Sequence, residues 1–289
     1  MKTTFKVFSI IAAFCIILGI IFIIAGLFMG ANIFEAGKFM RFQSDDEFYQ
    51  TYDTNFVDSI EVELSYGQLR IKRGESGASG SLVELSAINI KDDWFDVTRE
   101  NGKLTIKDRA GGGLFGGRWH LGPVSLGYEP IINIVIPPGE FSFDGVKINA
   151  GAGELDIDDL STETLNVELG AGSTDISGLK AERLKLSGGV GESRIKDAFV
   201  DTAEISSGVG KIVFEGVITN GGDISSGVGS IDLEISGKRE DYGFDVETGL
   251  GECRINGDSF RGYHEPNADI TKRFDLECGV GSIDMDFVE

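Results

Sequence analysis

Carboxylate side chains recur at a fixed spacing in the second half of the chain, and carboxylates are ligands that Ca²⁺ prefers. Asp156 and Asp158 flank an apolar residue, and Asp175 follows Asp156 after 19 residues. Glycine-rich β-rolls that bind Ca²⁺ repeat every nine residues or so, whereas here Arg194 follows Asp175 after a further 19 residues. Opposite charges at one spacing predict a solvated ladder of ion pairs. A Ca²⁺ site at Asp156, Asp158 and Asp175 is the alternative.

A glycine-rich loop at residues 110–128 is the second place where recognition chemistry is concentrated. Its aromatic, basic and imidazole side chains form a candidate recognition loop made of Phe115, Arg118, Trp119 and His120. Such residues suit a membrane interface or a ligand. The loop lacks the Gly-Lys-Ser/Thr of a phosphate-binding loop. The alternative is a long hairpin loop whose aromatic rings pack on the rest of the domain.

The sequence shows no evident arrangement of residues for nucleophilic catalysis. The two histidines, His120 and His264, lie in predicted loops without a neighbouring serine or cysteine nucleophile. Cys253 and Cys278 fall at positions that are not neighbours in the repeat described below, so we expect two buried thiols rather than a disulfide. We therefore assign no catalytic residue and no cofactor, and we keep a polysaccharide-active enzyme with groove carboxylates as an alternative function.

These side chains must be positioned by a repeat, because Gly-x-Gly with an apolar x occurs seven times after residue 150. The first five copies are 19 residues apart, and the last two gaps are 22 and 30 residues. A fixed short period indicates one small structural unit stacked on itself. The structural glycines are Gly151, Gly153, Gly170, Gly172, Gly189, Gly191, Gly208, Gly210, Gly227, Gly229, Gly249, Gly251, Gly279 and Gly281.

Each unit reads as two short strands separated by turn residues. The seventh position of every copy is apolar and its neighbours are mostly polar, as in Ile157, Ile176 and Ile195, which is the alternation of a half-buried strand. Glycines fit a tight corner where a Cβ would crowd the next coil. We predict an all-β fold, a parallel β-solenoid with coils of about 19 residues. An antiparallel sandwich or barrel is the alternative, and outward-facing Ile157, Ile176 and Ile195 would contradict the solenoid.

The first half of the chain contains a degenerate copy of the unit and several further strands. In residues 61–71, Tyr66-Gly67 replaces Val-Gly and Ile71 fills the seventh position. Asn101-Gly102 predicts a hairpin turn. Further strands are expected at Leu82–Ile90, Phe95–Arg99, Lys103–Asp108, Ile131–Ile136 and Val146–Asn149.

The amino-terminal region predicts a membrane anchor. Residues 7–29 contain no charge and are long enough to cross about 30 Å of hydrocarbon as a helix. Lys2 and Lys6 precede them, which places the tail in the cytoplasm and the large domain outside it. Ser44 and Glu47 match a helix capping box, and Phe48 and Tyr52 follow at the spacing i, i+4, so we expect a short helix that caps the solenoid.

The composition limits the kinds of partner that the chain can bind. The chain has 289 residues, a net charge of −21 and a pI near 4.4, which excludes nucleic-acid binding through a basic face. The predicted organisation is a cytoplasmic tail, a transmembrane helix, a juxtamembrane segment with the capping helix, irregular coils and regular coils, at residues 1–6, 7–29, 30–55, 56–149 and 150–289.

Three segments in order carry a family resemblance. SIEVELSYGQLRI, FDVTRENGKLTIKD and IINIVIPPGEF, followed by GAGELDI-type repeats, resemble the putative-adhesin family of bacterial β-strand-repeat domains over residues 56–289. The resemblance implies a β-helical envelope domain behind a single membrane helix, with some relatives linked to envelope stress, and it transfers no catalytic residue.

We therefore expect a single-pass membrane protein whose extracytoplasmic domain binds an envelope protein or surface polymer, as an adhesin or in envelope-stress sensing. Exposed strand edges at the solenoid ends would also allow edge-to-edge self-association. A structural spacer without a specific ligand is a further alternative to the polysaccharide-active enzyme.

Overall fold

The computed structural model describes residues 47–75, 81–90, 95–108, 129–260, 262–264 and 271–288. The predicted membrane helix at 7–29 and the glycine-rich loop at 110–128, with Phe115, Arg118, Trp119 and His120, lie outside these residues. Within the described part of the chain, no helix is both long and apolar enough to cross a bilayer.

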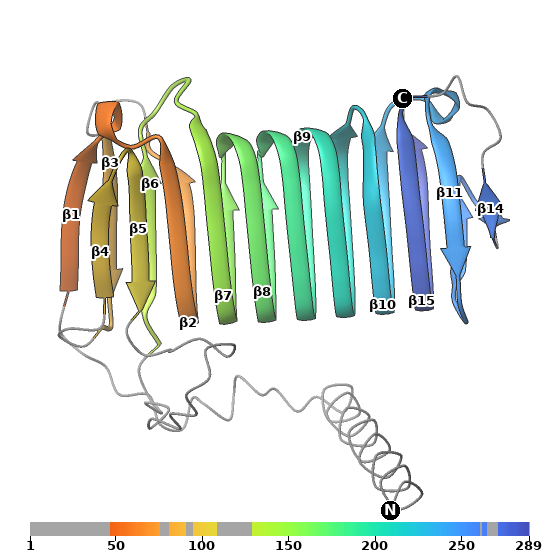
Figure 1. The fold of residues 1–289 in the computed structure, drawn as a ribbon, viewed down its shortest axis with the longest axis horizontal. Helices are drawn as coiled ribbons and strands as arrows, with labels where there is room; N and C mark the ends of the chain where they lie inside the picture. Colours follow the sequence, from red (N-terminus) through yellow and green to blue (C-terminus); the bar gives the residue numbers. More distant parts are fainter. Residues whose placement is uncertain are drawn as a thin grey trace, which may run out of the picture. The chain divides into compact units, whose positions relative to one another are not determined.

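The described residues form an all-β fold, as the sequence predicts. A single open sheet of 15 strands runs through it in the order β1-β3-β6-β2-β7-β8-β9-β10-β15-β11-β14, with β4, β5, β12 and β13 attached beside this path (Figure 1). The strands are β1 (Glu47–Asp53), β2 (Ser59–Arg73), β3 (Leu82–Ile88), β4 (Phe95–Glu100), β5 (Lys103–Asp108), β6 (Ile131–Ile136), β7 (Phe143–Asp158), β8 (Ser161–Ser177), β9 (Lys180–Ile218), β10 (Gly221–Ser236), β11 (Gly243–Thr248), β12 (Glu252–Ile255), β13 (Asp258–Phe260), β14 (Tyr263–His264) and β15 (Arg273–Val288).

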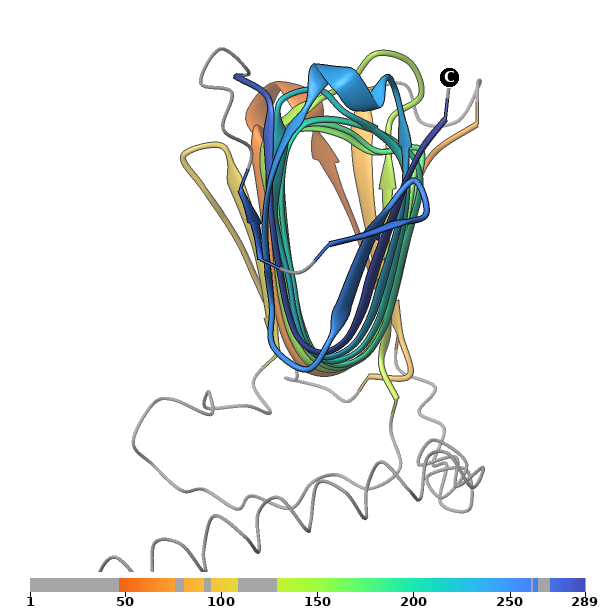
Figure 2. The same ribbon diagram turned by 90° about the vertical axis from the view of Figure 1, so that its right-hand side faces the viewer.

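Each regular coil is a U with two limbs. In β8 the first limb runs to Leu169, the chain bends at Gly170–Gly172, and the second limb runs from Ser173 to Ser177. Figure 2 views the nested coils along the stack and shows the limbs converging at a narrow bend. We call the side of the domain that carries the Gly-x-Gly motifs the bend edge, and the side with turns such as Gly178-Leu179 the turn edge.

Neighbouring coils pair in parallel with an offset of 19 residues. Ile157 is opposite Ile176, and Ile176 is opposite Ile195. All three side chains are buried and belong to one continuous apolar core, each contributing about 1.5–3 kcal/mol by leaving water. The inward direction and the parallel register agree with a solenoid-like fold and contradict an antiparallel sandwich.

The glycines are required by the close approach of backbones at the bend. Gly172 has a φ of +139°, and a Cβ at this position would overlap the carbonyl oxygen of Gly153 on the preceding coil. A Cβ on Gly170 would likewise overlap the carbonyl oxygen of Gly151. The motif therefore selects glycine twice, once for its backbone conformation and once for the space it leaves.

The degenerate copy in the first half is confirmed. Gly67 pairs with Gly153, and Ile71 with Ile157, so β2 forms a complete coil in register with the repeats. The coil before it is made of β5 and β6, which pair in parallel with the first and second limbs of β2. Asn101 and Gly102 both have positive φ between the antiparallel strands β4 and β5, as the predicted hairpin requires.

The predicted capping helix is wrong for residues 47–53. They form β1, which pairs in antiparallel fashion with β3 and lies at one end of the sheet path. Tyr52 is buried and Phe48 packs against the core. A spacing of four puts two side chains on one face of a strand as well as on one face of a helix, and pairing with β3 satisfies backbone groups that a covering helix would leave open.

The last two repeats stack out of chain order. The copy at Gly279 stacks on that at Gly227, and the copy at Gly249 stacks on Gly279. Thus β15, the last strand in sequence, lies between β10 and β11 (Figure 1). The gaps of 22 and 30 residues in the repeat mark this change of order.

Candidate functional site

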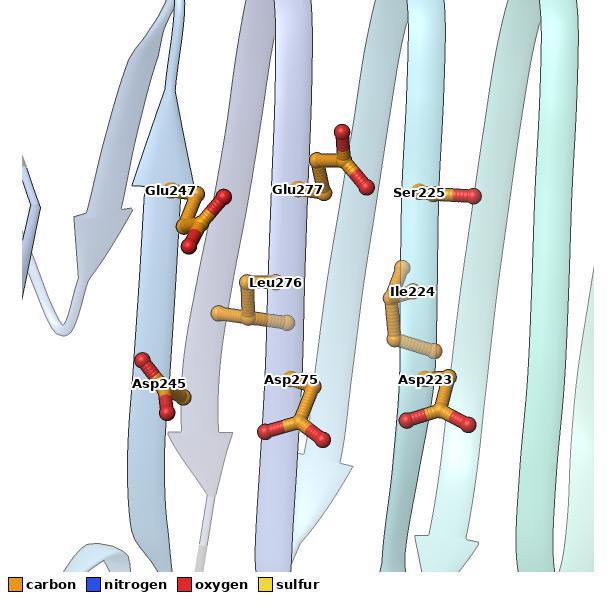
Figure 3. Close-up of a pocket in the computed structure, with 8 residues that line it drawn as sticks. All are labelled: Asp223, Ile224, Ser225, Asp245, Glu247, Asp275, Leu276 and Glu277. Atoms are coloured by element: carbon orange, nitrogen blue, oxygen red, sulfur yellow. The ribbon is translucent and has the colours of Figure 1, made fainter. Parts of the chain in front are cut away.

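An acidic groove crosses the outer surface of β10, β15 and β11 near the end of the stack. Its lining residues are Asp223, Ser225, Asp245, Glu247, Asp275 and Glu277, with Ile224 and Leu276 at its floor. Figure 3 shows the carboxylates in two rows across the three strands. We call these eight residues the acidic groove.

Parallel pairing brings the carboxylates together. Asp275 is opposite Asp223 on one side and Asp245 on the other. Neighbouring strands in a sheet lie about 4.8 Å apart, and like charges placed directly opposite each other destabilise a sheet. The groove is therefore a concentration of negative charge that the fold holds against electrostatic repulsion.

Repulsion and burial both act on the middle carboxyl. Burial raises the pKa of Asp275 above its usual value, and Asp223 and Asp245 raise this pKa further, while Arg273 opposes them. At the rim, the Nδ1 of His264 lies 2.8 Å from an Oδ of Asp245. His264, which the sequence places in a surface loop, is exposed on the short strand β14.

The groove is one end of a longer outer column, which we define as the residues four positions before the first residue of each bend, a glycine in the repeats and Ser65 in β2. In order along the stack they are Glu61, Lys147, Asn166, Lys185, Glu204, Asp223, Asp275 and Asp245. At the other end, the Nζ atoms of Lys103 and Lys147 lie 2.7 Å and 3.4 Å from the Glu61 carboxylate. The hydrogen bond from Lys103 is the main reason why the pKa of Glu61 is lowered.

Two of the three proposed Ca²⁺ ligands, Asp156 and Asp175, instead take part in ion pairs on the second limb. Asp156 and Asp175 are opposite each other, and each accepts from an arginine, Arg70 at 3.3 Å and Arg194 at 3.2 Å. Asp158 lies opposite Ser177 on the next coil. Across residues 47–288 with the gaps given above, no group of three or more His, Cys, Asp or Glu side chains has the geometry to hold a metal ion.

The two described cysteines are buried free thiols on adjacent coils. Cys253 is opposite Ile283, whereas Cys278 is opposite Thr248. Burial raises the pKa of Cys253 to about 12, so the nucleophilic thiolate is a minor species at neutral pH.

Sequence reasoning missed the acidic groove, although a signal for it exists. Aspartate stands four positions before the first glycine in each of the last three copies, at Asp223, Asp245 and Asp275. Reading the repeats as columns would have grouped them. The central place of Asp275 depends on the exchanged stacking order, which the sequence pattern does not state.

The fold has recognised relatives. The Toastrack DUF4097 family matches residues 57–259. No curated protein matches the chain.

Similar solved structures include a "putative adhesin" from Bacteroides fragilis, at 15% identity, covering 85% of this chain and 99% of that chain, with a TM-score of 0.44. A "putative lipid binding protein" from Parabacteroides distasonis is 12% identical, with coverages of 86% and 98% and a TM-score of 0.46. A "putative cell adhesion protein" from Clostridium sporogenes is 16% identical, with coverages of 84% and 99% and a TM-score of 0.36. Because the family match covers well over half of the sequence, this chain belongs to the Toastrack DUF4097 family.

Proposed function

We propose that this chain is a membrane-anchored, extracytoplasmic binding module that captures a positively charged envelope partner. The observation that carries the proposal is the acidic groove, where Asp275 lies between Asp223 and Asp245. A fold that retains like charges side by side gains stability when a cation neutralises them, because the repulsion is then relieved.

The negative charge of the groove should also speed its association with a positively charged partner. Clefts lined by one sign of charge increase the association rate of oppositely charged molecules, and this effect weakens with salt. The net charge of −21 acts in the same direction. An adhesin-like role and a role in envelope-stress sensing both use this capture step.

The test is capture by the full-length chain from native membranes solubilised in mild detergent. The triple variant Asp223→Asn, Asp245→Asn, Asp275→Asn should lose most of the captured partner, and moderate salt should release the partner from the unmodified protein. The matched control Glu154→Gln, Glu163→Gln, Glu182→Gln removes three exposed carboxylates elsewhere and should retain capture.

Capture that is equal in both triple variants would reject the groove as the binding site. The absence of any specific partner would favour the structural spacer. Release of shortened glycans from wall material incubated with the protein would favour the polysaccharide-active enzyme.

A further inference from the structure

A row of aliphatic side chains, exposed or half-buried, follows the bend edge. They are the middle residues of the Gly-x-Gly motifs, and four of them are large and exposed: Val190 at 43%, Val228 at 43%, Val280 at 47% and Leu250 at 89%. In stacking order the row is Ala152, Ala171, Val190, Val209, Val228, Val280 and Leu250. We call these seven residues the aliphatic ridge.

The geometry of the bend makes the ridge straight and protruding. Each of its side chains has a glycine on both sides, so no neighbouring side chain on the same coil rises beside it. With coils about 4.8 Å apart, seven of them extend over about 30 Å. Exposed apolar residues in a continuous row usually mark a contact surface, whereas isolated ones do not.

The first described residue, Glu47, lies at this same edge. Glu47, where the description begins, is level with Ile88 and Ile131 in the sheet, and Ile131 is opposite Gln68, the residue after the Gly67 bend. The 23 uncharged residues at 7–29 therefore precede an entry point at the bend edge.

The connection from β5 to β6 departs from the bend edge as well. The carboxylate of Asp108 accepts from the backbone N–H of Ser65, the first residue of the bend of β2. At the other end, the carbonyl of Pro130 accepts from the N–H of Gln68. The coil made of β5 and β6 thus carries residues 109–130 where the regular coils carry Gly-x-Gly.

We propose that the bend edge lies against the lipid bilayer, with the aliphatic ridge as the contact, and this inference rests on the membrane anchoring proposed above. A flat surface suits a straight ridge, and aliphatic side chains gain free energy on leaving water for the acyl boundary. The residues after the second glycine include Glu154, Glu192 and Glu252. The contact is therefore hydrophobic and does not require anionic lipid.

This contact would also fix how the domain is oriented on the membrane, which bears on the proposed function. With the bend edge on the bilayer, the limbs stand upright on the membrane and the acidic groove on the outer surface of a limb faces sideways. A partner in the same membrane or in the adjacent wall can then reach the groove without passing under the domain.

The test uses the full-length chain in phosphatidylcholine proteoliposomes. A fluorophore on Val228→Cys reports the ridge, and one on Asp197→Cys reports the turn edge. Spin-labelled lipid should quench the fluorophore at residue 228 several-fold more strongly than that at residue 197. The protein with only its native cysteines, treated with the same dye, gives the background, and adding phosphatidylglycerol should not increase quenching. Equal quenching at the two positions would overturn the inference.

Ridge variants separate lipid contact from misfolding. With the fluorophore on Val209→Cys, the substitutions Val190→Ser, Val228→Ser and Val280→Ser together should abolish most quenching. The control Phe199→Ser changes an exposed apolar residue next to the turn edge and should leave quenching unchanged. Both proteins should keep the parental unfolding midpoint. Unchanged quenching in the triple variant would contradict the ridge as the contact.

Two further readouts distinguish this inference from the proposed function. Alkaline washing that releases the chain from membranes would reject the anchor and the lipid contact together. A chain that stays anchored and captures its partner, but shows no ridge quenching, would reject the lipid contact alone.

Discussion

At one end of the outer column a carboxylate lies between two lysines, and at the other end a carboxylate lies between two carboxylates. Lys103 and Lys147 both reach Glu61, whereas Asp275 has Asp223 and Asp245 as its neighbours. The strands pair in parallel in both places, although Lys103 reaches Glu61 diagonally from the position opposite Ser59. The difference shows that the repeat determines where side chains are stacked, while the residue chosen at each level decides whether the stack stabilises the fold or presents charge to a partner.

Disrupting the stacking of the coils, on which both ends depend, should have the largest effect on the free energy of unfolding. Gly172→Ala places a Cβ against the carbonyl of Gly153 at a φ of +139°. Overlap and backbone strain of about 1–3 kcal/mol each should together lower the free energy of unfolding by about 3 kcal/mol or more. The control Gly257→Ala has positive φ but no atom within 4 Å of the new Cβ, so it should lose only about 1–2 kcal/mol. Urea unfolding measures both, and equal losses would show that close packing at the bend is unimportant.

The lysine-flanked end should be the more sensitive of the two to loss of its carboxylate. Glu61→Gln removes the charge that Lys103 and Lys147 both contact, and should lower the free energy of unfolding by about 1 kcal/mol. High salt should reduce the difference from the parental protein, since screening already weakens the pairs. A gain in stability would contradict the assignment of this end as favourable.

Neutralising the middle carboxylate of the groove should instead raise the free energy of unfolding, and by a smaller amount. Asp275→Asn keeps the shape of the side chain and removes the middle negative charge, so unfolding should become less favourable by a few tenths of a kcal/mol. Urea unfolding at neutral pH and low salt gives the value. If this variant is destabilised as much as Glu61→Gln, the two ends do not differ electrostatically.

Acidification should produce the smallest changes and should reduce the difference between the two ends. Glu61 has a pKa below its ordinary 4.5, so its stabilisation is complete above that value and is lost as the pH falls through the lowered pKa. Asp275 has a pKa above its ordinary 3.8, so its penalty is complete above the raised pKa and disappears as the pH falls from there towards 3.8. Unfolding free energies measured from pH 7 downward should therefore bring each variant closer to the parental protein, from opposite sides.

Much of the fold could be predicted because its signals are local and repeated. The apolar seventh position and the glycine pairs gave the buried columns and the bends, including the degenerate copy at Gly67. The strand β1 was predicted as a helix because Phe48 and Tyr52 satisfy both periodicities, and only pairing with β3 decides between them. The groove was missed because residues far apart in sequence, Asp223 and Asp275, become neighbours through stacking order.

That stacking order has a consequence for how the chain is completed during synthesis. Residues 243–255, in β11 and β12, leave the ribosome before β15, yet their parallel partner in the finished sheet is β15. The earlier coils can stack one upon another as each is made, but this stretch has to wait unpaired, or detach from β10, until its later neighbour slides into place. The last coils therefore cannot be completed in chain order, and until β15 is in place the open edge of β10 is exposed to pairing with another chain.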